Sequence, residues 1–576
     1  MQEMTHPNGF AWRFAEGVLP SELDALVAAF PDLDAVPGVR LIKRNHFRAV
    51  YEVPPGVSST PTTSDSASGA LLAKVYRYTS RWDRFRFRLI RARAEQEWVA
   101  LSRFHELGLA TARPVAVAVW RDGGRLVGGG LLASFLGGTE ALGNRLHRLA
   151  QEAGGADATP NAEAAHILTT TGQYLRRLHD QGVWHRDLHA GNFLVSEDGE
   201  KVYLIDLHTC VFVGRLVRWQ ARRGVIKLLH SLQHLPREWL RLLLDAYGWG
   251  RLYSVGKPSQ EEERLFQGAE RLERKRLRSR SKRCFKPSTR FEVKHHPRGV
   301  RYYRLRLRDG AAWAASELES LYRPSPPQEV LKQDTNGWVA RVPTPSGEKV
   351  CVKYRRLSLL ESFQALVESH RLRRAYAAGH AFWVHHVPTP QVLALREHRT
   401  LGLVRESYLV TEFVLDALPL DQFLKKEYWG REAPFGDEAR ARHRLALRVG
   451  NLVRKVHSSG FYPHDFSPQN VLVTRQALVE DGSRLTGLQL VDLDHLYLWQ
   501  PLFRRGRRKN LVQLGNLCEG HIGASDRLRA LRAYCGGAVE SPYCHPAWIR
   551  ELDRRLLLEH RRVLDELVRQ ENEASQ

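Results

Sequence analysis

The stretch Val183–Val195, which reads V-W-H-R-D-L-H-A-G-N-F-L-V, decides the fold of this chain. It contains the pattern H-R-D-x-x-x-x-N, which places Asp187 and Asn192 on one loop. Two short apolar runs follow, one on each side of the polar turn S-E-D-G-E, and this alternation predicts a β-hairpin. Because Asp206 comes directly after the second run, the hairpin is expected to bring it back toward the loop.

These three side chains are of the types that phosphoryl transfer from ATP requires. One carboxylate acts on the acceptor hydroxyl, an amide and a second carboxylate hold Mg²⁺, and a lysine holds the phosphates. We therefore predict that Asp187 is the base and that Asn192 and Asp206 are metal ligands. The alternative is an ordinary hairpin with acids that face solvent. The agreement of motif, hairpin and following acid favours catalysis.

The same pattern occurs a second time near the far end of the chain. Phe461–Val473 reads F-Y-P-H-D-F-S-P-Q-N-V-L-V, and L-V-D-L follows it. Asp465 and Asn470 each lie 278 residues after their counterparts (465 minus 187, 470 minus 192). Asp492 lies 286 residues after Asp206 (492 minus 206), because the second hairpin has a longer turn. Such self-similarity predicts a duplicated domain, with Asp465 as base and Asn470 and Asp492 as metal ligands.

A strand with a single lysine precedes each motif. The first reads L-L-A-K-V-Y-R around Lys74 and the second V-C-V-K-Y-R around Lys353, 279 residues later (353 minus 74). This shared register predicts that both lysines bind phosphate, as part of a small sheet with one helix. No G-x-G-x-x-G precedes either lysine, which departs from ordinary protein kinases. The departure favours a small-molecule or glycolipid acceptor.

Length and charge limit the possible architectures and partners. A chain of 576 residues is expected to hold two to four domains, and the duplication places a junction near residue 282. We therefore predict domains at 1–281 and 282–576. The formal net charge of +24 indicates an anionic partner. The basic run Arg271–Arg283 is either a solvated helix end or a membrane contact, whereas Arg504–Lys509 is the better candidate for substrate binding.

No uninterrupted apolar run approaches the eighteen or so residues of a membrane span, which predicts a cytosolic protein. The six cysteines form no C-x-x-C pair, which predicts reduced thiols in a reducing compartment. A zinc site is an alternative for one group of cysteines and histidines, although their spacing is irregular. Its members are Cys518, His521, Cys535, Cys544 and His545.

With these residues established, the chain resembles a tandem pair of lipopolysaccharide core kinases, the Kdo and heptose kinase family of the protein-kinase-like fold. In the first copy the resemblance rests on A-K-V-Y, E-W-V-A-L, H-R-D-L-H-A-G-N-F-L-V and L-I-D-L-H. In the second it rests on V-K-Y-R, H-D-F-S-P-Q-N-V-L-V, V-D-L-D-H and N-L-V-Q-L-G-N-L. It implies an α+β fold with two bilobal domains, each with a small antiparallel sheet as N-lobe and a mainly helical C-lobe.

The resemblance also implies roles and partners. Lys74 and Lys353 would bind the ATP phosphates, and Glu97 would pair with Lys74 from the N-lobe helix. ATP and Mg²⁺ are the expected cofactors. The acceptor would be a Kdo or heptose hydroxyl of lipopolysaccharide or of another anionic glycolipid. We expect the protein to contact the anionic cytoplasmic face of an inner membrane peripherally.

The second copy departs from the family pattern at two positions. Ala375 stands where the first copy has Glu97, so Lys353 lacks an evident partner, and Glu368 is a substitute only if the helix is shifted. Pro463 stands where the first copy has His185. These departures keep open a kinase with a regulatory, catalytically inactive second domain.

Three further functions stay open. The same fold phosphorylates protein Ser, Thr or Tyr in some enzymes and small molecules such as aminoglycosides in others. A scaffold that binds nucleotide or glycan without catalysis is a third possibility. We do not expect nucleic acid as a partner, because the basic runs lack the interleaved aromatic residues that stack on bases.

Overall fold

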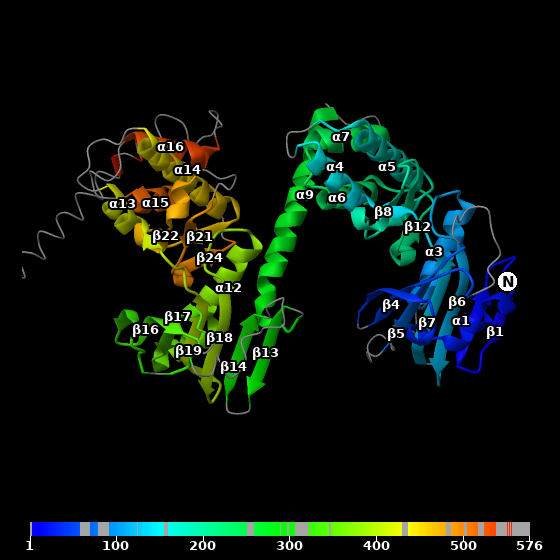
Figure 1. The fold of residues 1–576 in the computed structure, drawn as a ribbon, viewed down its shortest axis with the longest axis horizontal. Helices are drawn as coiled ribbons and strands as arrows, with labels where there is room; N and C mark the ends of the chain where they lie inside the picture. Colours follow the sequence, from blue (N-terminus) through cyan, green and yellow to red (C-terminus); the bar gives the residue numbers. More distant parts are fainter. Residues whose placement is uncertain are drawn as a thin grey trace, which may run out of the picture. The chain divides into compact units, whose positions relative to one another are not determined.

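The computed structural model of this chain has mixed α/β content, with several small antiparallel sheets and helices packed beside them (Figure 1). It divides into two compact units, unit 1 (Met1–Glu273) and unit 2 (Arg274–Gln576). The structure describes residues 3–45, 47–57, 69–78, 91–123, 125–154, 159–249, 258–288, 290–296, 299–305, 321–323, 325–344, 347–428, 436–479, 485–499, 504–515, 524–536, 550, 552 and 554–555.

Unit 1 contains a seven-stranded antiparallel sheet with the strand order β1-β2-β6-β7-β5-β4-β3. Lys74 lies on the interior strand β5, which pairs with β4 on one side and β7 on the other and has mostly buried residues. Helix α3 packs on β6 and β7 and brings Glu97 to the sheet. The elements are β1 Glu3–Thr5, β2 Phe10–Phe14, α1 Asp24–Ala29, β3 Arg40–Arg44, β4 Arg48–Val53, β5 Leu71–Arg77, α3 Arg93–Glu106, β6 Pro114–Asp122 and β7 Arg125–Ser134.

The rest of unit 1 is mainly helical and carries two small sheets, β11-β10-β8 and β12-β9. The predicted hairpin is present, because β10 pairs with β11 antiparallel. Its apolar residues Phe193, Val195 and Leu204 are buried in one core with the helices. The elements are β8 Thr139–Ala141, α4 Leu142–Glu152, α5 Ala162–Asp180, β9 Val183–His185, β10 Phe193–Ser196, β11 Val202–Leu204, β12 Cys210–Phe212, α6 Arg218–Ser231, α7 Arg237–Tyr247 and α9 Pro258–Ser281.

Unit 2 repeats this topology. Its large sheet has the order β13-β14-β18-β19-β17-β16-β15, which is the order of unit 1 strand for strand, and the small sheets β20-β22-β23 and β21-β24 correspond as well. The strands are β13 Phe291–His296, β14 Val300–Leu305, β15 Val330–Asp334, β16 Gly337–Pro343, β17 Lys349–Arg356, β18 Val392–Thr400, β19 Leu403–Glu412, β20 Leu418–Pro419, β21 Phe461–Pro463, β22 Val471–Val473, β23 Leu488–Leu490 and β24 Leu496–Leu498. The helices are α11 Leu359–Val367, α12 Arg371–Val384, α13 Leu420–Tyr428, α14 Asp437–Ser458, α15 Arg504–Gly515 and α16 Ala524–Cys535.

Each large sheet has more strands than the small sheet with one helix that the sequence predicts. Each has seven strands, and in unit 2 both α11 and α12 follow the lysine strand β17. The division between the units falls inside helix α9, after Glu273, whereas the predicted junction at 281–282 is where this helix ends. Within the described residues, no helix is both long and apolar enough to cross a bilayer.

The structure bears on two of the predictions about the cysteines. Cys210, Cys284 and Cys351 are free thiols, whereas Cys535 is disulfide-bonded. The expectation of reduced thiols is therefore wrong for Cys535, and a sulfur that is held in a disulfide is not a thiolate ligand for zinc. The other members of the alternative zinc group, Cys518, His521, Cys544 and His545, lie outside the described residues.

Candidate active site

The loop of unit 1 that carries Asp187 is fixed by its own motif residues. The backbone N–H of Asp187 donates to Nδ1 of His185 at 3.2 Å, and Nδ2 of Asn192 donates to the Asp187 carbonyl at 2.9 Å. Burial lowers the pKa of His185 to about 4, so its imidazole is neutral and Nδ1 is free to accept. The Asp187 side chain itself stays 60% exposed. The predicted base Asp187 is therefore held at its backbone and open at its carboxylate.

Asp206 lies next to this loop and has an unusual backbone. Its φ of 62° is left-handed, a conformation that non-glycine residues rarely adopt, and Asp492 of unit 2 has a φ of 56°. The N–H of Ile205 donates to the Asn192 carbonyl at 2.9 Å, which ties the hairpin to the loop. Both copies therefore have a strained backbone at the same position. The strain fixes the direction in which the carboxylate points in each unit.

Three cationic or hydrogen-bonding groups surround the Asp206 carboxylate. His208 Nδ1 and Arg48 Nη1 each lie 3.0 Å from Oδ1, and Lys74 Nζ lies 3.8 Å from it. Burial alone would raise the pKa of Asp206. The hydrogen bond with His208 and the positive charges of Lys74 and Arg48 outweigh burial and hold this pKa well below its usual range. Asp206 is therefore ionised at neutral pH, as a metal ligand must be.

Lys74 and Glu97 form a buried ion pair. Lys74 Nζ lies 2.5 Å from Glu97 Oε1, and the Tyr76 hydroxyl donates to Oε2 at 2.9 Å. Lys74 is 7% exposed and Glu97 2% exposed, so both charges depend on this pairing for their stability. The structure thus brings Lys74, Glu97 and Asp206 together at one place, where the resemblance put the phosphates of ATP.

In unit 2 the lysine has different partners. Lys353 Nζ lies 2.9 Å from Asp492 Oδ1 and 2.5 Å from Asp494 Oδ2. Burial opposes the charge on Lys353, but the two carboxylates outweigh it and raise its pKa. The suggested substitute, Glu368, pairs instead with Arg374 at 2.9 Å. Glu368 is therefore not the partner of Lys353, because Asp494 already satisfies that lysine from the turn after β23.

The loop of unit 2 has a different support behind the base. Asn470 Nδ2 lies 3.1 Å from Asp465 Oδ2, and no histidine precedes Asp465 by two residues, because that position is Pro463. Helix α15 supplies the support. Asn510 Nδ2 donates to the Pro463 carbonyl at 2.7 Å, and Gln513 Nε2 donates to the His464 carbonyl at 3.1 Å. The loop is therefore held by amide side chains in place of an imidazole.

Some of these residues were not singled out by motif reasoning. Asp494 corresponds to His208 in unit 1, and Gln513 corresponds to Lys227, each at the offset of 286 that relates Asp492 to Asp206. Lys227 of α6 donates to the Arg186 carbonyl and lies 3.3 Å from Asp187 Oδ1. The signal for Asp494 was visible in V-D-L-D-H, where a second acid follows the first. Lys227 had no such signal, since a lysine on an amphipathic helix usually faces solvent.

The chemistry of the predicted metal ligands fits Mg²⁺. This ion prefers carboxylate and amide oxygens, which Asp206 and Asn192 supply in unit 1 and Asp492 and Asn470 in unit 2. In unit 1 the Asn192 amide nitrogen is already bonded to the loop, which leaves its amide oxygen as the end for a cation. Glu97, Asp206 and His208 also bring ligand atoms within 4.8 Å of one another. Glu97 is committed to Lys74 and Tyr76, so Asn192 and Asp206 remain the better pair.

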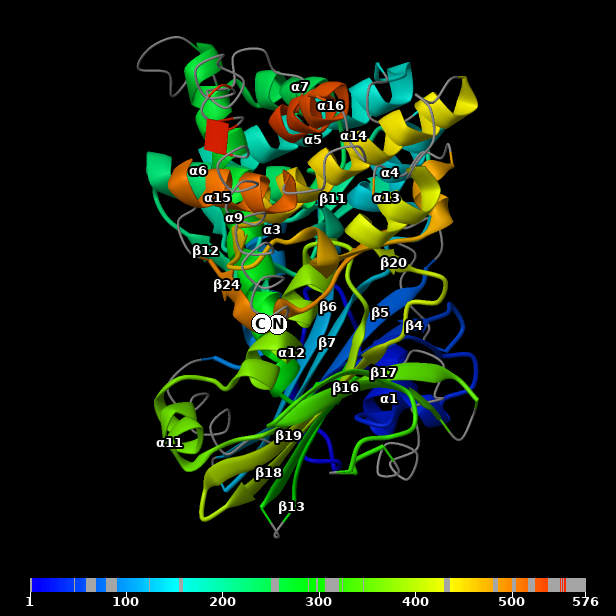
Figure 2. The same cartoon turned by 90° about the vertical axis from the view of Figure 1, so that its left-hand side faces the viewer.

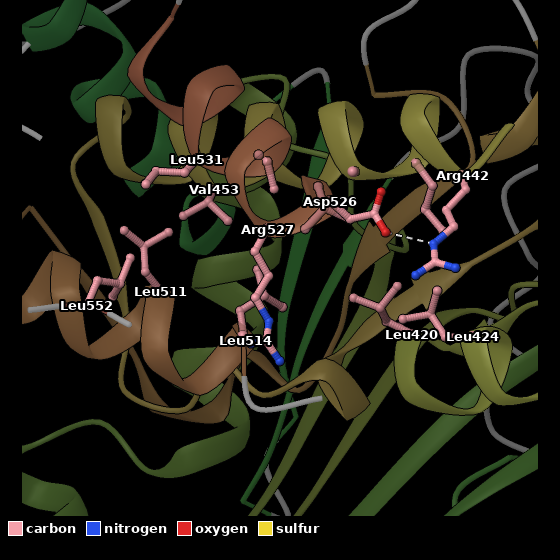
Figure 3. Close-up of a pocket in the computed structure, with 16 residues that line it drawn as sticks. Leu420, Leu424, Arg442, Val453, Leu511, Leu514, Asp526, Arg527, Leu531 and Leu552 are labelled. Atoms are coloured by element: carbon pink, nitrogen blue, oxygen red, sulfur yellow. Dashed lines mark hydrogen bonds and ion pairs between the residues drawn. The ribbon is translucent and has the colours of Figure 1, made fainter. Parts of the chain in front are cut away.

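A separate cavity of about 120 Å³ lies in the helical part of unit 2 (Figure 3). Leucines from α13, α14, α15 and α16 line it, and Arg442 Nε bonds Asp526 Oδ2 at 2.7 Å on one side. Among the described residues that line this cavity there is no member of the predicted site. The cavity therefore does not belong to the predicted active site.

Comparison with known proteins identifies the family. The model described as "Lipopolysaccharide kinase (Kdo/WaaP) family" matches residues 67–247 and 345–534, which is more than half of the chain. No curated protein matches the sequence. One similar solved structure, "WaaP in complex with acyl carrier protein", shares 21% sequence identity, covers 40% of this chain and 87% of its own, and has a TM-score of 0.30.

The two matched segments hold all nine predicted site residues. These are Lys74, Glu97, Asp187, Asn192 and Asp206 in the first segment and Lys353, Asp465, Asn470 and Asp492 in the second. Members of this family are phosphotransferases that act on sugar hydroxyls of lipopolysaccharide. The chain belongs to the lipopolysaccharide kinase (Kdo/WaaP) family, with one family match in each of its two units, and is a kinase.

Proposed function

We propose that the chain uses ATP and Mg²⁺ to phosphorylate Kdo or heptose hydroxyls in the core of lipopolysaccharide or of a similar lipid-linked glycan. The observation that carries this proposal is the buried Lys74–Glu97 ion pair beside Asp206. A lysine that is held by a helix carboxylate next to a metal-binding acid is the arrangement that ATP phosphates require. The kinase family of the chain supplies the sugar acceptor.

In unit 1 each residue then has one role. Lys74 binds the ATP phosphates, and Asn192 and Asp206 would hold Mg²⁺, which neutralises charge on the phosphates when it is bound. Asp187 accepts the proton of the sugar hydroxyl as that oxygen attacks the terminal phosphorus of ATP, and ADP leaves as the bond from this phosphorus to the bridging oxygen breaks. The exposure of the Asp187 carboxylate supports this role, because the acceptor must reach it from outside.

In unit 2 we propose that Lys353, Asp465, Asn470 and Asp492 have the same roles. Three contacts support activity in this unit. Asp494 holds Lys353 in the absence of a helix glutamate, and Asn510 and Gln513 hold the loop that carries Asp465. The domains 1–281 and 282–576 would each be a bilobal, protein-kinase-like catalytic domain, with the large sheet as N-lobe and the helical part as C-lobe.

We further propose that the protein works at the cytoplasmic face of an inner membrane, in peripheral contact with anionic lipid. The formal net charge of +24 supports this location. Each basic residue near an anionic leaflet contributes about 1 kcal/mol of attraction, so a few such residues suffice for reversible binding. The acceptor would be presented there by its lipid anchor.

An acceptor panel tests this function. The purified chain is incubated with ATP labelled at the terminal phosphate and with lipopolysaccharide, Kdo-lipid, a generic protein substrate or an aminoglycoside. We expect label on a glycan acceptor, with loss of transfer when Mg²⁺ is chelated. Label on protein or aminoglycoside alone would replace the proposed acceptor, and no transfer to any acceptor would remove the proposal.

A further inference from the structure

Helix α11 carries its large apolar side chains on the solvent side. Those of Leu359, Leu360, Phe363, Leu366 and Val367 are 62, 70, 57, 61 and 96% exposed. Their spacing of i, i+1, i+4, i+7 and i+8 places all five within an arc of about 120° on one face of the helix. This set is called the α11 strip below. A surface helix ordinarily turns such a strip toward the core, so α11 is inverted.

The inversion is fixed by polar contacts beside the strip. Ser362 is fully buried, and its hydroxyl lies 2.7 Å from the carbonyl oxygens of both Ser358 and Val404. Ser358 and Glu361 form a capping box that sets where the helix begins. Figure 2 shows α11 beside the strands of the large sheet of unit 2, on the side of β19. The polar face is thus committed to the sheet, and the apolar face is left outside.

Positive charge borders the α11 strip at both ends. Arg356 precedes the helix and Arg371 follows it, and both are exposed. Of the acids near the strip, Glu361 pairs with Arg355 at 3.0 Å and Glu368 with Arg374 at 2.9 Å, and Glu406 of β19 is the cross-strand neighbour of Arg356. An apolar strip between cations matches the interface of a bilayer, where acyl chains lie beneath anionic headgroups.

We propose that α11 is a membrane-docking element, which inserts the α11 strip into the interface of a bilayer that contains anionic lipid. This inference rests on the proposed function, because a lipid-linked acceptor is held at such a surface. Docking would take place near the proposed active site of unit 2, since α11 begins six residues after Lys353 (359 minus 353), just after strand β17. A second copy of the chain fits the strip less well, because its own bordering arginines would meet like charges.

The test measures binding of the full-length chain to vesicles by co-sedimentation. Vesicles of phosphatidylglycerol and phosphatidylethanolamine are compared with vesicles of phosphatidylcholine. We expect the double variant Leu360→Ser/Val367→Ser to bind the anionic vesicles at least tenfold more weakly than the wild type. The matched control is Val479→Ser, which removes a side chain that is 59% exposed elsewhere in unit 2, and we expect it to bind like the wild type. A second variant, Arg356→Glu/Arg371→Glu, is expected to lose the preference for anionic lipid.

Three results would overturn the proposal. The first is equal vesicle binding by the wild type and the α11 double variant, and the second is an equal loss in the Val479→Ser control. The third is a wild-type dimer in lipid-free buffer that the α11 variant converts to a monomer, which would assign the strip to a second copy. Transfer of phosphate to a soluble, delipidated core oligosaccharide is measured in parallel. Vesicle binding without any such transfer would remove the proposed function and leave the docking element intact.

Discussion

At the scale of single residues, the two copies differ in the carboxylate that holds the lysine predicted to bind phosphate. Unit 1 places Glu97 on the helix and His208 two residues after the metal acid. Unit 2 has Ala375 on the helix and Asp494 at the position of His208. The two differences compensate each other, because one acid near the lysine is lost and another is gained. A comparison of helix positions alone cannot find this exchange, since the acids come from elements far apart in the sequence.

We predict that Asp494→Ala weakens ATP binding by unit 2 at least tenfold, or about 1.4 kcal/mol. Asp494 is a buried acid, and its loss leaves Lys353 with only Asp492, the acid that the metal needs. ATP titration in a Lys74→Ala background confines the measurement to unit 2. Glu368→Ala is the matched control and should bind ATP normally, because Glu368 pairs with Arg374. Equal affinity of the Asp494 variant and this control would contradict the exchange.

A second prediction at this scale concerns Lys227. Its ammonium lies beside Asp187 and would meet the phosphoryl group as it passes to the acceptor. With Asp465→Asn silencing unit 2, Lys227→Ala should lower kcat on the order of a hundredfold and change KM for ATP little, because one charge that stabilises the transition state is lost. Lys227→Arg should restore part of kcat. An unchanged kcat in Lys227→Ala would restrict this lysine to holding the loop.

At the scale of elements, the close approach of two helix pairs depends on one glycine in each unit. A Cβ at Gly172 of α5 would lie 2.4 Å from the Leu243 carbonyl oxygen in α7, and one at Gly450 of α14 would lie 2.0 Å from that of Ala530 in α16. The two glycines are 278 residues apart (450 minus 172), the offset of the catalytic loops. These helices lead into and pack behind the loops, so their spacing positions both bases.

Gly172→Ala is therefore expected to destabilise unit 1 by about 1–3 kcal/mol, because α5 and α7 must move apart to admit the methyl group. The measurement is the thermal unfolding midpoint of the full chain, which should fall by several degrees. Gly214→Ala is the matched control, since a Cβ there meets no atom within 4 Å. An unchanged midpoint for Gly172→Ala would mean that the helix pair adjusts without cost.

The sequence predicted the local elements near the motifs better than it predicted the edges of the fold. The hairpin after Asp187 and the lysine strands were readable because apolar alternation and turn residues agree there. The strands β1 and β2 were missed, since β2 joins the sheet through β6, about a hundred residues away, and no local pattern specifies that pairing. Helix α4 was also not predicted, although Leu142, Leu146 and Leu149 lie at helical spacing and could have indicated it. Asp494 and Lys227 were not predicted as site residues. Asp494 has a sequence signal in V-D-L-D-H, whereas the position of Lys227 depends on a tertiary contact with Asp187.

At the scale of the whole molecule, the chain holds two units of one topology, each with a lysine, a base, an asparagine and a metal acid. The better preserved motif belongs to unit 1, and the predicted lysine of each unit has a carboxylate partner. If both units are active, as proposed, the chain would phosphorylate two hydroxyls, or one hydroxyl in each of two acceptors. The inverted helix α11 belongs to unit 2, where it follows strand β17.

The most direct test of this account is mass spectrometry of the phosphate added to a lipopolysaccharide core acceptor by the wild type, Asp187→Asn, Asp465→Asn and the double variant. Replacing a base by its isosteric amide removes proton transfer and leaves the fold intact. We expect each single variant to lose one class of product and the double variant to add no phosphate. Undiminished transfer by the double variant would contradict the assignment of Asp187 and Asp465 as the catalytic bases.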